Sequence, residues 1–218
     1  MKGVVACIAL GLAVVGVATA ARGDPQKQVR PADQARAKAM LLRKADVGPG
    51  FKASKPSDDE FDFYCKALDE SDLVLTGEAE SLDLEKKNEA RYLSAGSGSE
   101  VYETKAQSAE SWRRGTSAAG MKCMEAGFRK LAKEIGRGTT FASLRKVAFP
   151  RIAPDTAAFR VVFKVVTTPM IMDSVVMRNG RAQAWTLVFG VPSAYPRAEQ
   201  LRLSRIVAGR IAQAMRGE

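Results

Sequence analysis

Residues 170–191 read MIMDSVVMRNGRAQAWTLVFGV, and this stretch decides the fold that we expect. Asn179-Gly180 lies between two runs rich in apolar residues, and this dipeptide strongly favours a two-residue turn between antiparallel strands. We therefore expect strands over 170–178 and 181–191, with Asn179 and Gly180 at the centre of the turn. The register that follows pairs Arg178 with Arg181, Val176 with Gln183, Ser174 with Trp185, Met172 with Leu187 and Asp173 with Thr186.

The segments around this hairpin predict further strands and helices. The other expected strands are 139–149, 159–167 and 82–103, the last as two strands or as one strand broken by a bulge. The expected helices begin at Pro31, at Lys105 after a cap at Thr104, at Ser117 and at Pro196. Helices that flank consecutive strands are typical of an α+β fold, here an antiparallel sheet of about five or six strands packed against N-terminal, central and C-terminal helices.

The first residues of the chain predict a secretory signal peptide over 1–20. Lys2 precedes an almost wholly apolar run, and Ala18-Thr19-Ala20 is a small-x-small cleavage site in front of Ala21. Cleavage after Ala20 would place the protein outside the reducing cytosol, as a secreted or extracytoplasmic protein. A retained membrane anchor is the alternative, which is disfavoured because the basic residues follow the apolar run.

The rest of the chain is expected to form one domain. Residues 21–30 are polar and show no periodicity, so they predict a flexible leader. Residues 31–218 have a length that suits a single α+β domain.

Cys65 and Cys123 are the cysteines that remain after the signal peptide. An even number of cysteines in an oxidising compartment favours one disulfide, with two separate buried thiols as the alternative. Cys65 ends a short segment, 61–65, that is expected to be extended. The chain contains no histidine, and two cysteines this far apart do not fit a zinc site, so no metal is expected.

Charge and composition narrow the classes of function. A formal net charge of +10 favours anionic partners such as lipid headgroups or acidic envelope polymers, whereas export disfavours nucleic acid. The lack of histidine excludes Ser-His and Cys-His nucleophilic sites. Neither a P-loop nor a dinucleotide-binding fingerprint occurs, so we expect no cofactor and no enzymatic activity. The arginine-rich side of the last helix would suit peripheral contact with a membrane.

Several weak motifs occur together in this chain. The first helix ends in Ala45-Asp46-Val47-Gly48-Pro49-Gly50-Phe51, a cysteine follows, and Lys122-Cys123 lies inside an expected helix. With the Val175–Arg181 hairpin and the arginine-rich last helix, this pattern resembles the secreted sensor-like domains of actinobacteria, including the extracellular parts of receptor serine/threonine kinases. The resemblance covers most of the chain after the signal peptide. It implies an α+β extracytoplasmic domain with disulfides that binds a ligand.

We therefore expect a secreted, non-enzymatic, sensor-like module that binds a small or lipid-like ligand at the cell envelope. One alternative is an envelope hydrolase that works without histidine, and paired carboxylates in a cleft would favour it. Another alternative is a structural or adhesive envelope protein, and a flat polar sheet face would favour that.

One face of the sheet is the candidate ligand site. The bulkier face of the hairpin strands is expected to join the core, and it carries Met172, Val176, Trp185, Leu187 and Phe189. The opposite face is apolar yet carries charges and small side chains that leave room. We expect this face to line a groove for an anionic amphiphile, with Arg160 and Lys164 at the headgroup and Asp173, Val175 and Thr186 beside it. The alternative is that a helix covers the face and Asp173 pairs with Arg160 or Lys164.

Overall fold

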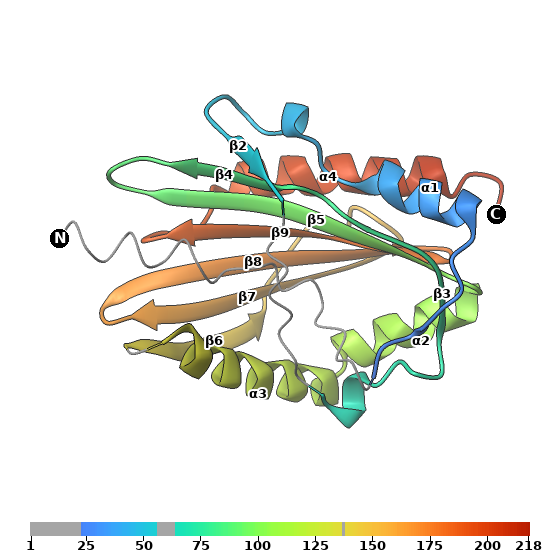
Figure 1. Ribbon diagram of the computed structural model, residues 1–218, viewed down its shortest axis with the longest axis horizontal. Helices are drawn as coiled ribbons and strands as arrows, with labels where there is room; N and C mark the ends of the chain where they lie inside the picture. The colour runs from blue at the N-terminus through green and yellow to red at the C-terminus, as the bar shows by residue number, and fades with distance from the viewer. Residues whose placement is uncertain (1–22, 56–63, 137) are drawn as a thin grey trace.

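A nine-stranded sheet is the centre of the computed structural model, which describes residues 23–55, 64–136 and 138–218 (Figure 1). The main path of the sheet runs β1-β3-β5-β9-β8-β7-β6, while β4 pairs with β5 and carries β2 at its outer side. All pairs are antiparallel except that of β1 with β3. The strands are β1 (Gln26–Lys27), β2 (Lys52–Ser54), β3 (Val74–Glu80), β4 (Asp83–Lys87), β5 (Tyr92–Tyr102), β6 (Thr139–Lys146), β7 (Asp155–Val165), β8 (Thr168–Asn179) and β9 (Ala182–Val191).

Helices cover both faces of this sheet. In Figure 1, α1 and α4 lie together on one side, and α2 and α3 lie on the other. The described helices are α1 (Pro31–Met40), α2 (Lys105–Thr116), α3 (Ala118–Ile135) and α4 (Arg197–Ala214), with the short 3₁₀ turns η2 (Lys44–Asp46) and η3 (Lys66–Leu68). The predicted α+β class is therefore confirmed, and the sheet is larger than expected.

The helix starts follow from local capping. The Thr104 hydroxyl accepts a hydrogen bond from the Gln107 amide at 3.1 Å, so α2 begins where the sequence predicts. Ser117 joins α2 to α3 because its hydroxyl accepts from the Gly120 amide and donates to the Arg114 carbonyl, both at 2.9 Å. A Cβ on Gly120 would lie 2.1 Å from that carbonyl oxygen, so glycine lets the helices meet this closely.

The hairpin at Asn179-Gly180 forms, but its register differs from the prediction by two residues. Asn179 pairs with Ala182, so the turn residues are Gly180 and Arg181. Gly180 has φ of +61°, whereas Arg181 does not have a positive φ, a pattern that fits a type II′ turn with glycine in the first central position. A shift of two residues keeps every side chain on its face of the sheet, so the predicted division into two faces survives.

One other expectation needs correction. The segment expected to be a flexible leader contains the strand β1 (Gln26–Lys27), which pairs with β3, and the Gln26 amide donates to the Leu73 carbonyl at 2.8 Å. β3 itself was not predicted. The proposed signal peptide over 1–20, and most of the expected extended segment 61–65, lie outside the described residues.

The two faces of the sheet hold separate cores. One core lies under α1 and α4 and includes Val175, Met177, Ala184 and Val188 of the strands with Leu203, Val207 and Ile211 of α4. The other core lies under α3 and includes Phe163, Met172 and Phe189 of the strands with Phe128 and Ala132 of α3. Each core is therefore built from alternate residues of the same strands.

Candidate functional site

A cavity of about 130 Å³ lies between the sheet and the helices α2 and α3. Gly115 and Thr116 at the end of α2 and Gly127 in α3 are part of its wall. A Cβ on Gly115 would meet no atom within 4 Å. The apolar side chains that line the cavity are Leu68, Trp112, Met124, Phe128, Leu144, Phe159, Val161, Met172, Val176, Trp185 and Leu187.

One end of this cavity is polar and acidic. Glu70, Glu100 and Ser111 line it, and all three contact the buried hydroxyl of Tyr102. The Tyr102 oxygen lies 2.9 Å from Glu70 Oε2, 2.8 Å from Glu100 Oε2 and 2.8 Å from Ser111 Oγ. The three cavity residues come from different parts of the fold: Glu70 follows η3, Glu100 is in β5 and Ser111 is in α2.

The contacts at the Tyr102 hydroxyl need more hydrogens than the two hydroxyl groups supply. Tyr102 and Ser111 carry one hydroxyl hydrogen each, and an ionised carboxylate can only accept. Three contacts to one oxygen therefore require a proton on either Glu70 or Glu100. The two carboxyl groups act as a unit that holds a proton and carries at most one negative charge.

Burial explains why this pair retains a proton. Burial, with the nearby charge of Glu70 as the next cause, raises the pKa of Glu100 to about 8. Burial also raises the pKa of Glu70 above its usual range, although hydrogen bonds from Ser111 and Tyr102 and the charge of Arg114 act in the opposite direction. Arg114 does not form an ion pair with Glu70, because its guanidinium group already binds Asp72 at 2.6 Å and Glu110 at 2.8 Å.

Trp185 forms the wall beside the acidic pair. Its ring lies against Gly98 of the neighbouring strand, where a Cβ would fall 2.0 Å from Trp185 Cζ2. The Gly96-Ser97-Gly98-Ser99 run thus has a structural cause, because only glycine at position 98 admits the indole. Trp185 is 6% exposed, and within the described part of the chain its Nε1 has no hydrogen-bond partner.

A second, polar cavity of about 350 Å³ adjoins the first. Glu100 and Trp185 line both cavities. The other residues around the second cavity are Lys27, Glu78, Ala79, Glu80 and Ser99. Lys27 Nζ lies 2.6 Å from Glu78 Oε1, and burial raises the pKa of Glu80.

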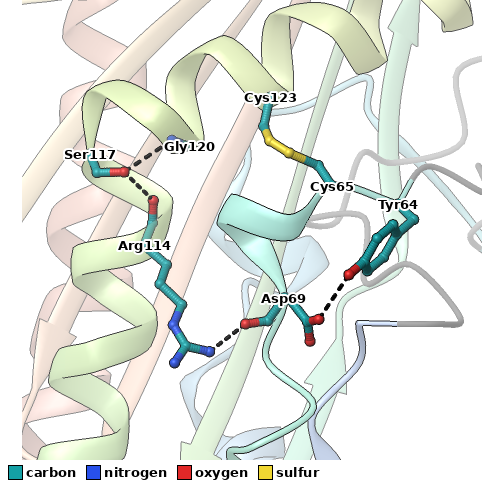
Figure 2. Close-up of a disulfide and its surroundings, with 7 residues drawn as sticks. All are labelled: Tyr64, Cys65, Asp69, Arg114, Ser117, Gly120 and Cys123. Atoms are coloured by element: carbon teal, nitrogen blue, oxygen red, sulfur yellow. Dashed lines mark hydrogen bonds between the residues drawn. A yellow bond between two sulfur atoms is a disulfide. The ribbon is translucent and has the colours of Figure 1, made fainter.

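A disulfide secures the segment that brings Glu70 to the site. Cys65 at the start of η3 is bonded to Cys123 of α3, as the sequence predicts (Figure 2). After η3, Arg114 donates a hydrogen bond to the Asp69 carbonyl, and the Asp69 carboxylate accepts from the Tyr64 hydroxyl at 3.0 Å. These contacts hold η3 against α2 and α3 and so place Leu68 and Glu70 at the cavity.

The helix α4 fills the space of the groove that was expected on the opposite face. Val175 and Thr186 are fully buried there, and the Thr186 hydroxyl lies 2.7 Å from the Ser204 hydroxyl of α4. Asp173 is also buried, and the Arg160 guanidinium binds it through two hydrogen bonds of 2.6 and 2.7 Å. Arg160 is thus occupied by a carboxylate of its own chain, which was the alternative interpretation.

Lys164 is exposed on β7 and does not lie at this pair. Of the five residues expected to form the site, the structure brings Arg160 and Asp173 together as an ion pair and buries Val175 and Thr186 in a core.

The acidic end of the cavity was missed at the level of sequence. Glu100 stands in a run of small and apolar residues, Ser99-Glu100-Val101-Tyr102, where a carboxyl on a buried strand is unusual. That position was the available signal. Ser111 and Glu70 carry no comparable signal, because they reach Tyr102 only through the packing of α2 and η3.

In the described ranges, no group of three or more Cys, Asp or Glu side chains is arranged to hold a metal ion. Among the same residues, no helix is long and apolar enough to cross a membrane.

Comparisons with known proteins gave one structural likeness. No protein-family model and no curated protein matched the chain. The extracellular domain of PknH from Mycobacterium tuberculosis, known from a crystal structure, is similar to this chain with a TM-score of 0.44 and 11% sequence identity, over 85% of this chain and 97% of that one.

Proposed function

We propose that this protein is a non-enzymatic, extracytoplasmic module that binds a small, largely apolar molecule in the cavity between the sheet and α2 and α3. The cavity itself carries this proposal: it is lined mainly by aromatic and aliphatic side chains, with a few polar groups gathered at one end. This combination is typical of small-molecule sites. A cavity of about 150 Å³ engineered into another protein binds benzene, so the volume here suits a ring or a short alkyl chain.

Location outside the cytosol belongs to the same proposal. The Cys65–Cys123 bond supports it, because such bonds persist in oxidising compartments. The small-x-small site at Ala18-Thr19-Ala20 after an apolar run supports export as well. The resemblance found in the sequence motifs adds a sensing role at the cell envelope to the proposal.

The geometry of the carboxyl pair argues against the hydrolase alternative. Glycosidases need two carboxyl groups with the scissile bond, and in some enzymes a water molecule, between them. Here the Tyr102 hydroxyl occupies the space between Glu70 and Glu100 and contacts both. A substrate bond has no place there.

Intrinsic fluorescence gives a direct test, because both tryptophans of the protein, Trp112 and Trp185, line the cavity. Titration with benzyl alcohol should change this fluorescence saturably. Val176→Phe, which fills the cavity, should weaken binding about tenfold or more. Val162→Phe is the matched control, since Val162 is a half-buried residue on the other face of β7 and should leave binding unchanged. Equal binding by Val176→Phe and the wild type would contradict the proposal.

A further inference from the structure

The charged side chains that line the cavity in the described part of the chain are both acidic. Glu70 and Glu100 line it, while its other polar residues are neutral: Ser111, Thr116, Ser174 and Gln183. No lysine or arginine is among the described residues of its wall. The charged groups that these described residues offer a ligand are therefore carboxyl groups.

Among the described residues, no basic side chain forms an ion pair with Glu70 or Glu100. A buried carboxylate is normally paired with a basic side chain, because leaving its charge unpaired is costly. The nearest guanidinium that influences the pair, Arg114, is engaged by Asp72 and Glu110. The contacts at the Tyr102 hydroxyl require a proton on Glu70 or Glu100. This proton compensates the charge that a basic side chain would otherwise compensate.

The surroundings of the pair also favour a cation. The adjoining polar cavity adds Glu78 and Glu80, and its one basic residue, Lys27, is bound to Glu78. Trp185 borders both cavities and is more than nine-tenths buried. Indole rings attract cations to their faces.

From these observations we infer that the ligand of this cavity carries an ammonium group, which binds at Glu70, Glu100 and Trp185 while its apolar part occupies the cavity. The inference rests on the proposed function and names the class of its ligand. An organic amine fits better than a metal ion, because the described residues offer no metal-binding cluster and the rest of the wall is apolar. The inferred charge is opposite to that of the anionic amphiphile expected from Arg160 and Lys164.

Three probes with the same alkyl chain separate charge from apolar contact: hexylamine, hexanol and hexanoate. At pH 7 the amine is a cation and the carboxylic acid an anion. Calorimetric titration of the full chain should show hexylamine binding about tenfold or more tightly than hexanol, because charge-assisted hydrogen bonds are the stronger ones. Hexanoate should bind more weakly than hexanol, since it would add a negative charge beside the carboxyl pair.

Glu100→Gln tests the inferred partner of the ammonium group. This variant keeps the shape of the side chain and its contact to Tyr102, so it should still bind hexanol but lose the preference for hexylamine. Glu70→Gln should act in the same direction and replaces it if Glu100→Gln fails to fold. Glu134→Gln on the exposed side of α3 is the control for net charge and should retain the preference.

Each other outcome overturns a defined part of the argument. If hexanol or hexanoate binds as tightly as hexylamine, the cavity remains a ligand site and the inference about the ammonium group is wrong. The same holds if Glu100→Gln and Glu70→Gln keep the full preference for hexylamine. If none of the three probes binds, the proposed function falls together with the inference.

Discussion

The two faces of the same strands are packed in different ways. On the side of α1 and α4, Val175, Met177, Ala182 and Ala184 are at most 1% exposed. The residues that alternate with these along the strands face α2 and α3. They include Val176, which is only half-buried and lines a cavity. One face is thus a closed core, and the other is a partly closed core with internal space.

Side-chain size explains this difference. Small residues on the first face allow α4 to approach until hydroxyl groups of strand and helix lie 2.7 Å apart, at Thr186 and Ser204. Bulky residues on the second face, such as Trp185 and Phe159, hold the helices away and cannot fill every gap between them. In this sheet, the face with small side chains is the one on which a helix packs closely, and the face with large side chains is the one that has the cavity.

The largest expected effect tests the closed face. Leu203→Ala should lower the free energy of unfolding by about 4 kcal/mol, because Leu203 of α4 is fully buried and its truncation leaves a new cavity. Leu187→Ala on the other face should cost about 1 kcal/mol, since Leu187 is half-buried beside existing space. Urea denaturation monitored by circular dichroism measures both values. Similar costs for the two variants would mean that the faces are packed alike.

The next effect concerns the disulfide that supports the open face. Replacing Cys65 and Cys123 together by serine should cost about 4 kcal/mol, because the bond closes a loop with a sequence separation of 58 residues. The loss should be accompanied by weaker binding of benzyl alcohol, since η3 carries Leu68 and leads to Glu70. Unchanged stability of this double variant under oxidising conditions would show that the bond does not hold the cavity wall.

The sequence predicted the parts of this fold that depend on local patterns. Alternating apolar residues and an Asn-Gly turn gave β8 and β9 and the correct division of side chains between the faces, although the turn is centred on Gly180 and Arg181. The edge strand β1 has no such pattern, because it consists of two exposed polar residues, Gln26 and Lys27, that pair with β3 through backbone hydrogen bonds.

The candidate site depends on distances that no local pattern contains. Which face stays open was predicted wrongly, because this depends on how closely α4 and α2 approach the sheet. Glu70 and Glu100 are thirty positions apart in the sequence. They come together because both contact the hydroxyl group of a third residue, Tyr102. The Cys65–Cys123 bond was predictable because these two cysteines are the ones that remain after the expected signal peptide. Its prediction therefore needed no knowledge of distances in the fold.

A smaller effect should appear in the pH dependence of stability. The pKa of Glu100 is raised from 4.5 to about 8 in the folded protein, so the folded state holds a proton that the unfolded state releases between these values. This contribution to stability is complete below about pH 4.5 and is lost as the pH rises through about 8. The raised pKa values of Glu70, Glu80 and Asp83 act in the same direction.

Thermal and urea unfolding between pH 5 and pH 8 measure this contribution. The wild type should lose about 3 kcal/mol over this range, and Glu100→Gln should lose clearly less. Carboxylates with lowered pKa values, such as Asp33 and Glu110, change their protonation at lower pH and do not enter this window. If the free energy of unfolding depends on pH in the same way in Glu100→Gln and in the wild type, Glu100 is not the group that holds the proton.

The smallest expected effect returns to the closed face. Lys164→Ala should change the free energy of unfolding by no more than about 0.5 kcal/mol, because Lys164 is exposed and the nearby ion pair of Arg160 with Asp173 does not include it. The variant should bind hexylamine, hexanol and hexanoate as the wild type does, since the cavity lies on the other side of the sheet. Titration of the three probes against Lys164→Ala and Val176→Phe in parallel completes the comparison between the faces. If Lys164→Ala loses hexanoate binding and Val176→Phe does not, Lys164 is part of an anion site on β7. That result would contradict the assignment of ligand binding to the open face.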